Sequence, residues 1–239
     1  MSTLCALLAA SQLTVFAASS LRDAFLELGG RFEAEHPGVA VSFNFAGSQQ
    51  LRTQIEHGAR ADVLATADEQ HLRALEERGL AEAPRTFARN EPVIVVPSGN
   101  PAAIHSLLEL PRAQRIVVGA PDVPIGAYTL RIFEAASARY GQGFRSALEA
   151  RIASRELNVR QVLAKVRLGE ADAAIVYRTD ALAAHEAVET ISIPADLNVV
   201  AEYPIAALRE APQPALALVF LELVLSQAGR ALLGRYGFR

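Results

Sequence analysis

The feature that most constrains the fold is a regular alternation of short apolar runs with segments of helical periodicity. Residues 13–18 form a buried-strand pattern, and one helical face then follows at Leu21, Ala24, Phe25, Leu28 and Phe32. Further strand patterns lie at 39–45, 62–66, 91–97, 115–119, 173–177 and 199–208. This order is typical of α/β proteins, so we predict an α/β fold with mixed, mostly parallel sheets.

The length of 239 residues fits one or two domains, and the 51% of hydrophobic residues is ample for a sizeable core. No flexible Gly/Ser linker divides the chain. If there are two lobes, the chain therefore crosses between them through ordered strands. The candidate crossings are 91–96 and 202–207.

The two most apolar stretches do not predict membrane spans. Residues 4–10 are apolar but short, with no Lys or Arg before them, so we interpret residues 1–12 as the remnant of an export leader. The run 215–225 is too short to cross a bilayer and Glu222 interrupts it, which favours a buried helix. Cys5 is the only cysteine, which excludes an internal disulfide and a Cys-based metal centre.

Charge and motifs exclude several classes of function. The net charge of −3 without a basic stripe argues against a nucleic-acid partner, so an anion would need a local site. The sequence contains no Gly-x-Ser-x-Gly elbow, Walker loop or dinucleotide-binding glycine motif. The histidines are scattered without metal-type spacing, and we expect them to be exposed or satisfied: His36, His57, His71, His105 and His185.

Candidate binding groups lie where predicted strands pass into predicted helices, at Ser19-Ser20, Gly47-Ser48 and Asn158-Val159. The N-terminus of a helix presents free N–H groups and a partial positive charge, which suit an anion. Serine and asparagine are also common helix caps, so only their convergence would indicate a site. Tyr177 ends an apolar strand, just before an expected helix cap at Thr179-Asp180, and is equally consistent with an edge of the core.

Taken in order, these junctions resemble a known family. The motifs are VFAASSL at 15–21, FAGS at 45–48, QIEHGARADV at 54–63, VPIGAY at 123–128, NVR at 158–160, GEADAAIVY at 169–177, YPI at 203–205 and RYGF at 235–238. Together they resemble the molybdate-binding component of molybdate ABC transporters, from Leu13 to the C-terminus.

The resemblance implies a type II periplasmic-binding-protein fold, with two lobes that are joined by a two-strand hinge and close on the ligand. Lobe I would comprise 13–90 and 203–239, and lobe II 91–202. In that family neutral donors hold the oxyanion. The positions that match are the hydroxyls of Ser20, Ser48 and Tyr177 and the backbone N–H groups of Ile125 and Val159. The resemblance implies no cofactor, and no metal other than the molybdenum or tungsten of the bound oxyanion.

Two positions depart from the family's pattern. Ile125 replaces a residue that is often alanine, and its side chain could narrow the pocket. Gln49 and Gln50 replace neighbours of the second serine that are often small or hydroxylic. Gln49 either adds a donor or faces solvent.

The resemblance implies a binding protein and not an enzyme, capturing molybdate or tungstate for a membrane permease and its ATPase. It also implies export to the periplasm or to the extracellular face of the cell membrane, free or lipid-anchored, and we expect a monomer. Three alternatives stay open: a sulfate-, thiosulfate- or phosphate-binding protein of the same fold, a serine-based enzyme on this scaffold, and an α/β protein with an unrelated ligand. A regulator's sensing domain is disfavoured, because too few residues precede Leu13 for a DNA-binding helix pair.

Overall fold

The computed structural model describes residues 11–239. Its strands are β1 (Ser11–Ala18), β2 (Val39–Ala46), β3 (Val63–Ala65), β4 (Arg85–Asn90), β5 (Pro92–Pro97), β6 (Ile116–Gly119), β7 (Ile152–Glu156), β8 (Ala173–Tyr177), β9 (Val188–Ser192) and β10 (Ala201–Ala207). Its helices are α1 (Arg22–Glu35), α2 (Ser48–Glu56), α3 (Glu69–Glu77), α4 (Pro124–Tyr140), α5 (Gly143–Glu149), α6 (Val159–Arg167), α7 (Arg178–Ala183), α8 (Pro214–Leu225) and α9 (Gln227–Arg235), with 3-10 turns η1 (Ser19–Leu21) and η2 (Leu107–Arg112).

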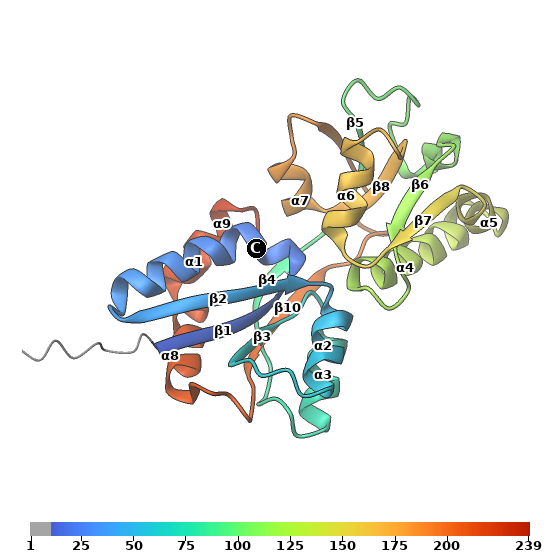
Figure 1. The fold of residues 1–239 in the computed structure, drawn as a ribbon. Helices are drawn as coiled ribbons and strands as arrows, with labels where there is room; N and C mark the ends of the chain where they lie inside the picture. Colours follow the sequence, from blue (N-terminus) through green and yellow to red (C-terminus); the bar gives the residue numbers. More distant parts are fainter. Residues whose placement is uncertain (1–10) are drawn as a thin grey trace, which may run out of the picture.

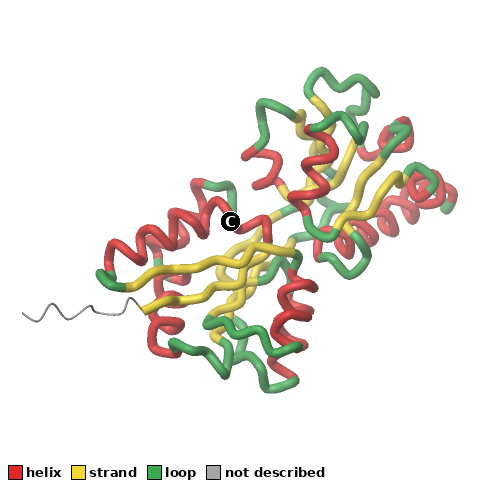
Figure 2. The backbone as a smooth tube through the Cα atoms, viewed as in Figure 1, coloured by secondary structure: helices red, strands yellow, loops and turns green. Residues whose placement is uncertain are grey.

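Two five-stranded mixed sheets are built on the same plan. The first has the order β2-β1-β3-β10-β4 and the second β7-β6-β8-β5-β9. In each sheet three strands run parallel, and a fourth joins them antiparallel and pairs with an edge strand. Each sheet forms the centre of one lobe (Figures 1 and 2). The predicted α/β architecture with mixed sheets is confirmed.

The alternation of side chains along β1 explains why helices cover both faces of the first sheet. Leu13, Val15 and Ala17 join the core that packs under α1 and α8. Phe16 points to the opposite face, where it packs with buried leucines of α2 and α3. A strand that is buried on both faces reads as a nearly continuous apolar run, which is the pattern from which it was predicted.

The chain crosses between the lobes twice, at Glu91 between β4 and β5 and along 193–200 between β9 and β10. Ala201 and Glu202 already pair with β4, so these two residues, which we assigned to lobe II, lie in the first sheet. Ser11 and Gln12, which we assigned to the leader, pair with β2. The rest of the predicted leader, residues 1–10, lies outside the described residues. Cys5 is among these residues.

The prediction for the C-terminal apolar run is only partly right. Helix α8 buries Ala217, Phe220, Leu221 and Val224, but Leu218 is 57% exposed on its outer face. Within 11–239 no single helix is long and apolar enough to cross a membrane. Helices α8 and α9 reach that length and composition only as a pair bent by 63°.

Candidate functional site: a closed cavity lined by neutral donors

The carboxyl ends of the parallel strands in both sheets face each other across one small cavity, in keeping with the usual place of ligands in α/β sheets. All five predicted residues line it: Ser20, Ser48, Ile125, Val159 and Tyr177. The centre of a water-sized sphere can occupy about 10 Å³ of it, roughly the space of one water molecule. The space between the lobes at this point therefore suits a small ion and not a metabolite.

The first lobe contributes two serine hydroxyls whose hydrogen bonds have different partners. Ser48 is 1% exposed, and its Oγ accepts a bond of 3.1 Å from the N–H of Ala67. Since Oγ is the acceptor in that bond, the hydroxyl hydrogen of Ser48 is available to a ligand. Ser20 Oγ lies 3.0 Å from the hydroxyl of the buried Tyr203. If Tyr203 donates, Ser20 has a free hydrogen as well.

The second lobe contributes the first turns of two helices. Ile125 is the second residue of α4, and Val159 is the first residue of α6. Backbone N–H groups in a first turn have no acceptor within their own helix. The Asn158 side chain caps α6 by accepting from the N–H of Gln161, at 3.1 Å, and leaves the Val159 N–H uncapped.

Two glycines bring the start of α4 close to the end of β6. A Cβ added at Gly126 would lie 2.0 Å from the carbonyl oxygen of Ala120, and one at Gly119 would lie 2.8 Å from Ile125 Cγ2. One branch of the Ile125 side chain therefore packs over Gly119, in the space that a larger residue would fill there. Ile125 itself lies at the cavity wall.

Tyr177 is the sharpest indication of a ligand. It is 1% exposed, and its hydroxyl oxygen has no hydrogen-bond partner among the described residues. Buried polar groups are almost always paired, so an orphaned hydroxyl at a cavity wall calls for an external partner. Burial, followed by the neighbouring Tyr203, raises the pKa of Tyr177 well above its ordinary value. The hydroxyl therefore stays protonated and can donate.

The electrostatics of the cavity come from the backbone. Of the described residues that line it, none carries a charged side chain. The starts of α2, α4 and α6 and of the η1 turn that leads into α1 all lie at its wall. Each helix start adds a partial positive charge, so the site attracts an anion without an ionic partner.

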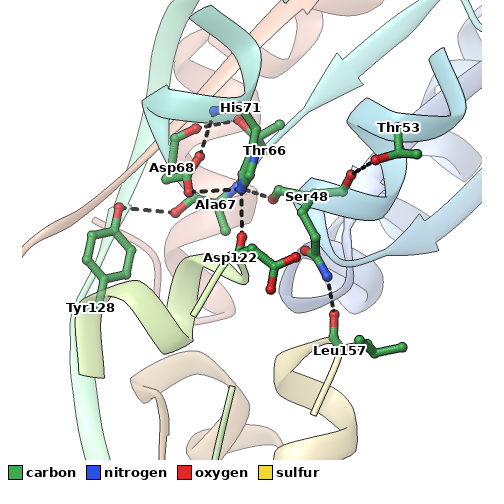
Figure 3. A network of polar contacts seen from close by, with 10 residues as sticks. Ser48, Thr53, Thr66, Ala67, Asp68, His71, Asp122, Tyr128 and Leu157 are labelled. Carbon is green, nitrogen blue, oxygen red and sulfur yellow. Dashed lines mark hydrogen bonds and ion pairs between the residues drawn. The ribbon is translucent and has the colours of Figure 1, made fainter. Parts of the chain in front are cut away.

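Around the cavity the two lobes touch directly (Figure 3). His71 Nε2 of α3 donates to the carbonyl oxygen of Asp122 at 2.9 Å, and the Tyr128 hydroxyl donates to that of Ala67 at 3.3 Å. Gln49 Nε2 donates to the carbonyl oxygen of Leu157 at 2.8 Å. The structure is therefore that of the closed arrangement.

Several sequence interpretations are wrong in detail. Ser19 and Ser20 make no side-chain cap, because η1 begins at Ser19 with Ala18 as its N-cap. Thr179 and Asp180 lie inside α7, whose N-cap is Tyr177. His71 is buried, and its Nδ1 has no hydrogen-bond partner within the described chain.

Gln49 neither lines the cavity nor faces solvent, because it is 8% exposed and lies between the lobes. Our sequence reasoning also gave no role to Tyr203, although it supports Ser20. The Tyr-Pro-Ile motif at 203–205 was the only signal for it.

The fold and the cavity define a two-lobed solute-binding protein. Residues 13–239 match the family of bacterial extracellular solute-binding proteins, and the chain belongs to this family. It is 42% identical over 231 residues to the molybdate-binding protein ModA of Mycobacterium tuberculosis, covering 96% of this chain and 85% of that protein. It is 32% identical over 236 residues to the molybdate-binding protein ModA of Escherichia coli, covering 95% and 88%. The resemblance inferred from the motifs is confirmed.

Solved structures agree on the fold. The periplasmic molybdate-binding protein of Azotobacter vinelandii gives a TM-score of 0.82 at 20% identity, covering 95% of this chain and 98% of that chain. The sulfate-binding protein SubI from Mycobacterium tuberculosis gives 0.84 at 19% identity, covering 96% and 86%. The predicted type II periplasmic-binding-protein fold is therefore confirmed.

Proposed function

We propose that this chain captures molybdate or tungstate in the closed cavity and delivers it to an ABC importer. The observation that carries the proposal is the convergence of neutral donors from both lobes, including the orphaned hydroxyl of Tyr177. The identity to molybdate-binding proteins over nearly the whole chain supports the same ligand. The binding residues would be Ser20, Ser48, Ile125, Val159 and Tyr177.

The proposed chemistry requires that the protein replace the hydration of a dianion. Burying an ion without partners costs several kcal/mol or more, so each oxygen needs donors. Hydrogen bonds to a charged acceptor contribute about 1.5–3 kcal/mol each. Three hydroxyls and two backbone N–H groups, from both lobes, supply such bonds only when the lobes close. Binding and closure are therefore one event in this proposal.

The same donors explain which ions would be rejected. Hydrogen phosphate carries a proton that needs an acceptor, and no carboxylate lies among the described residues of the cavity wall. Sulfate is the alternative ligand, because it is also a fully deprotonated tetrahedral dianion and the cavity between the lobes is small. The size of the closed cavity would decide between the larger and the smaller ion.

The membership of an extracellular solute-binding family supports a place outside the cytoplasmic membrane, either periplasmic or lipid-anchored. The partners would be a membrane permease and its cytoplasmic ATPase. We propose that the protein acts as a monomer, since both halves of the cavity come from one chain. The bound oxyanion would leave the protein chemically unchanged.

A thermal-shift titration of the ligand-stripped protein with molybdate, tungstate, sulfate and phosphate tests the ligand. At about a thousand times its Kd, a ligand adds about 4 kcal/mol of stability, which for a chain of this length is a rise in Tm of about 8–16 °C. We expect this rise with molybdate and tungstate. A rise in Tm with sulfate alone would mean that the ligand is sulfate and not molybdate, while the proposed binding site would stand. No rise in Tm with any of the four ions would overturn the proposed function.

Replacing Tyr177 with phenylalanine should weaken molybdate binding by about 10- to 150-fold, because one donor to a charged acceptor is lost. Stability without ligand should not fall, since the hydroxyl has no protein partner to lose. Isothermal titration calorimetry and chemical denaturation measure the two quantities. Tyr140→Phe, which removes a hydroxyl far from the cavity beside Phe144, is the matched control and should bind as the native chain does.

A further inference from the structure

We propose that Gln49 and Leu157 form an interlobe clasp that sets the gap across the oxyanion cavity. The contact joins α2 of the first lobe to Leu157 of the second lobe, the residue directly before the N-cap of α6. Gln49 follows the donor Ser48 directly, and Leu157 precedes the donor Val159 by two residues. The bond of 2.8 Å therefore fixes the separation of one donor from each lobe.

Both ends of the clasp are held firmly within their own lobes. The carbonyl oxygen of Gln49 accepts a hydrogen bond of 2.9 Å from Thr53 Oγ1, one turn further along α2. The N–H of Leu157 donates to Gln161 Oε1 at 3.1 Å, and Asn158 next to it caps α6. Figure 3 shows Ser48, Thr53 and Leu157 in this region. A change in the clasp would therefore be transmitted to the cavity wall.

The amide of Gln49 is specialised for the contact between lobes. It is buried, and its only hydrogen bond within the described residues is the one to Leu157, while its Oε1 has none. A side chain that served only the first lobe would have a partner there. Because the Leu157 carbonyl is an acceptor, the amide nitrogen must face it, and the bond forms only when the lobes are closed.

Gly47 leaves space for this amide. A Cβ at position 47 would lie 2.4 Å from Gln49 Oε1 and 2.3 Å from the carbonyl oxygen of Leu157. Gly47, the donor Ser48 and the clasp residue Gln49 are thus consecutive along the chain. We infer that Gln49 is a positioning residue. It does not contact the ion, but it affects the rate at which the ion dissociates and the preference of the cavity for ions of one size.

The test compares Gln49→Met with Gln54→Met. Methionine keeps the length of the side chain but cannot donate. Gln54 lies on the same helix, and its amide also takes part in one hydrogen bond, but within the first lobe: its Oε1 accepts from Asn44 Nδ2 at 2.7 Å. Stopped-flow kinetics would give the rates of molybdate association and dissociation, calorimetry the Kd of molybdate and of sulfate, and small-angle scattering the degree of closure.

We expect Gln49→Met to dissociate molybdate about 2- to 10-fold faster, the effect of losing one neutral hydrogen bond, with little change in association. The ratio of its Kd values for molybdate and sulfate should move closer to one, because the separation of the lobes across the cavity is less tightly fixed. Its stability without ligand should equal that of the native chain. Gln54→Met should keep the native dissociation rate and preference.

The clasp rests on the proposed function, and the two fail separately. If the native chain binds molybdate while both variants release it at the native rate, the clasp is overturned and the function stands. If the native chain binds sulfate alone, the same comparison is made with sulfate and decides the clasp equally. A native chain that binds neither ion overturns both the function and the clasp.

Discussion

Replacing Gly47 with alanine is expected to weaken molybdate binding by at least about 100-fold while leaving the first lobe folded. Gly47 has φ −65° and ψ 143°, an extended conformation that alanine adopts freely, so backbone strain is not the reason. The reason is clearance between the lobes. The new Cβ would lie 2.3 Å from the backbone carbonyl oxygen of Leu157, on the opposite lobe.

The size of the effect follows from what incomplete closure removes. The Gln49 amide near Gly47 can move aside, but the Leu157 carbonyl belongs to a capped helix start and cannot. The second lobe's three donors are the N–H groups of Ile125 and Val159 and the hydroxyl of Tyr177. If the lobes stay apart, at least two of these donors can no longer reach the ion. At about 1.5 kcal/mol or more for each bond, affinity falls by about 100-fold or more.

Calorimetry with molybdate measures the affinity of Gly47→Ala, and small-angle scattering with saturating ligand shows whether the lobes close. Gly30→Ala is the matched control. A Cβ there meets nothing within 4 Å, and alanine in this exposed helix position should add up to about 1 kcal/mol of stability without affecting binding. A Gly47→Ala variant that bound and closed like the native chain would show that the lobes need not approach this closely.

The strands that the sequence predicted and those that it did not differ in their place in the sheets. The central strands are buried on both faces and read as apolar runs, and all of them were predicted. Strands β4, β7 and β9 were not, and each is an edge strand with two or three exposed residues that break any apolar run. The fourth edge strand, β2, was predicted because it alternates Val39, Val41, Phe43 and Phe45. An edge strand with a polar outer face has no comparable pattern.

The candidate site divides in the same way. Ser20, Ser48 and Val159 have a local signal, since each lies where a predicted strand passes into a predicted helix, and Tyr177 ends a predicted strand. Ile125 was identified only through the resemblance to a family, which also indicated which of the junctions matter. The contacts between distant segments have no such signal. Gln49 and Leu157 are 108 positions apart, and Ser20 and Tyr203 are 183 apart. Neither spacing corresponds to any helical or strand period, so only the folded chain brings these pairs together.

A second large effect is expected at Arg160, outside the cavity. Its guanidinium lies 2.8 Å from Asp180 Oδ1 of α7 and 2.6 Å from Asp23 Oδ2 of α1, in the other lobe. The Asp180 side chain is fully buried, and this burial raises its pKa to about 6 although Arg160 opposes the shift. At pH 8 the carboxylate is ionised and depends on Arg160 for its charge partner.

Arg160→Met should therefore lower the free energy of unfolding by about 2–3 kcal/mol at pH 8, because Asp180 must either stay ionised without its partner or take up a proton two pH units above its native pKa. The pH dependence has a definite sign. A folded-state pKa above the unfolded value favours folding at low pH, and this contribution is lost as the pH rises through the folded pKa. In the native chain the loss is complete somewhat above pH 6. Without Arg160 the pKa of Asp180 rises further, so the loss continues to higher pH.

The deficit of Arg160→Met relative to the native chain should thus be small near pH 5 and grow steadily up to pH 8. Denaturant unfolding at pH 5, 6, 7 and 8 measures it. Arg139→Met removes an arginine from an ion pair with Asp196 in which both side chains are more than half exposed, and should cost at most about 1 kcal/mol at every pH. An Arg160→Met deficit of equal size at all four pH values would mean that the lost packing of the arginine stem, and not the buried charge of Asp180, accounts for the destabilisation.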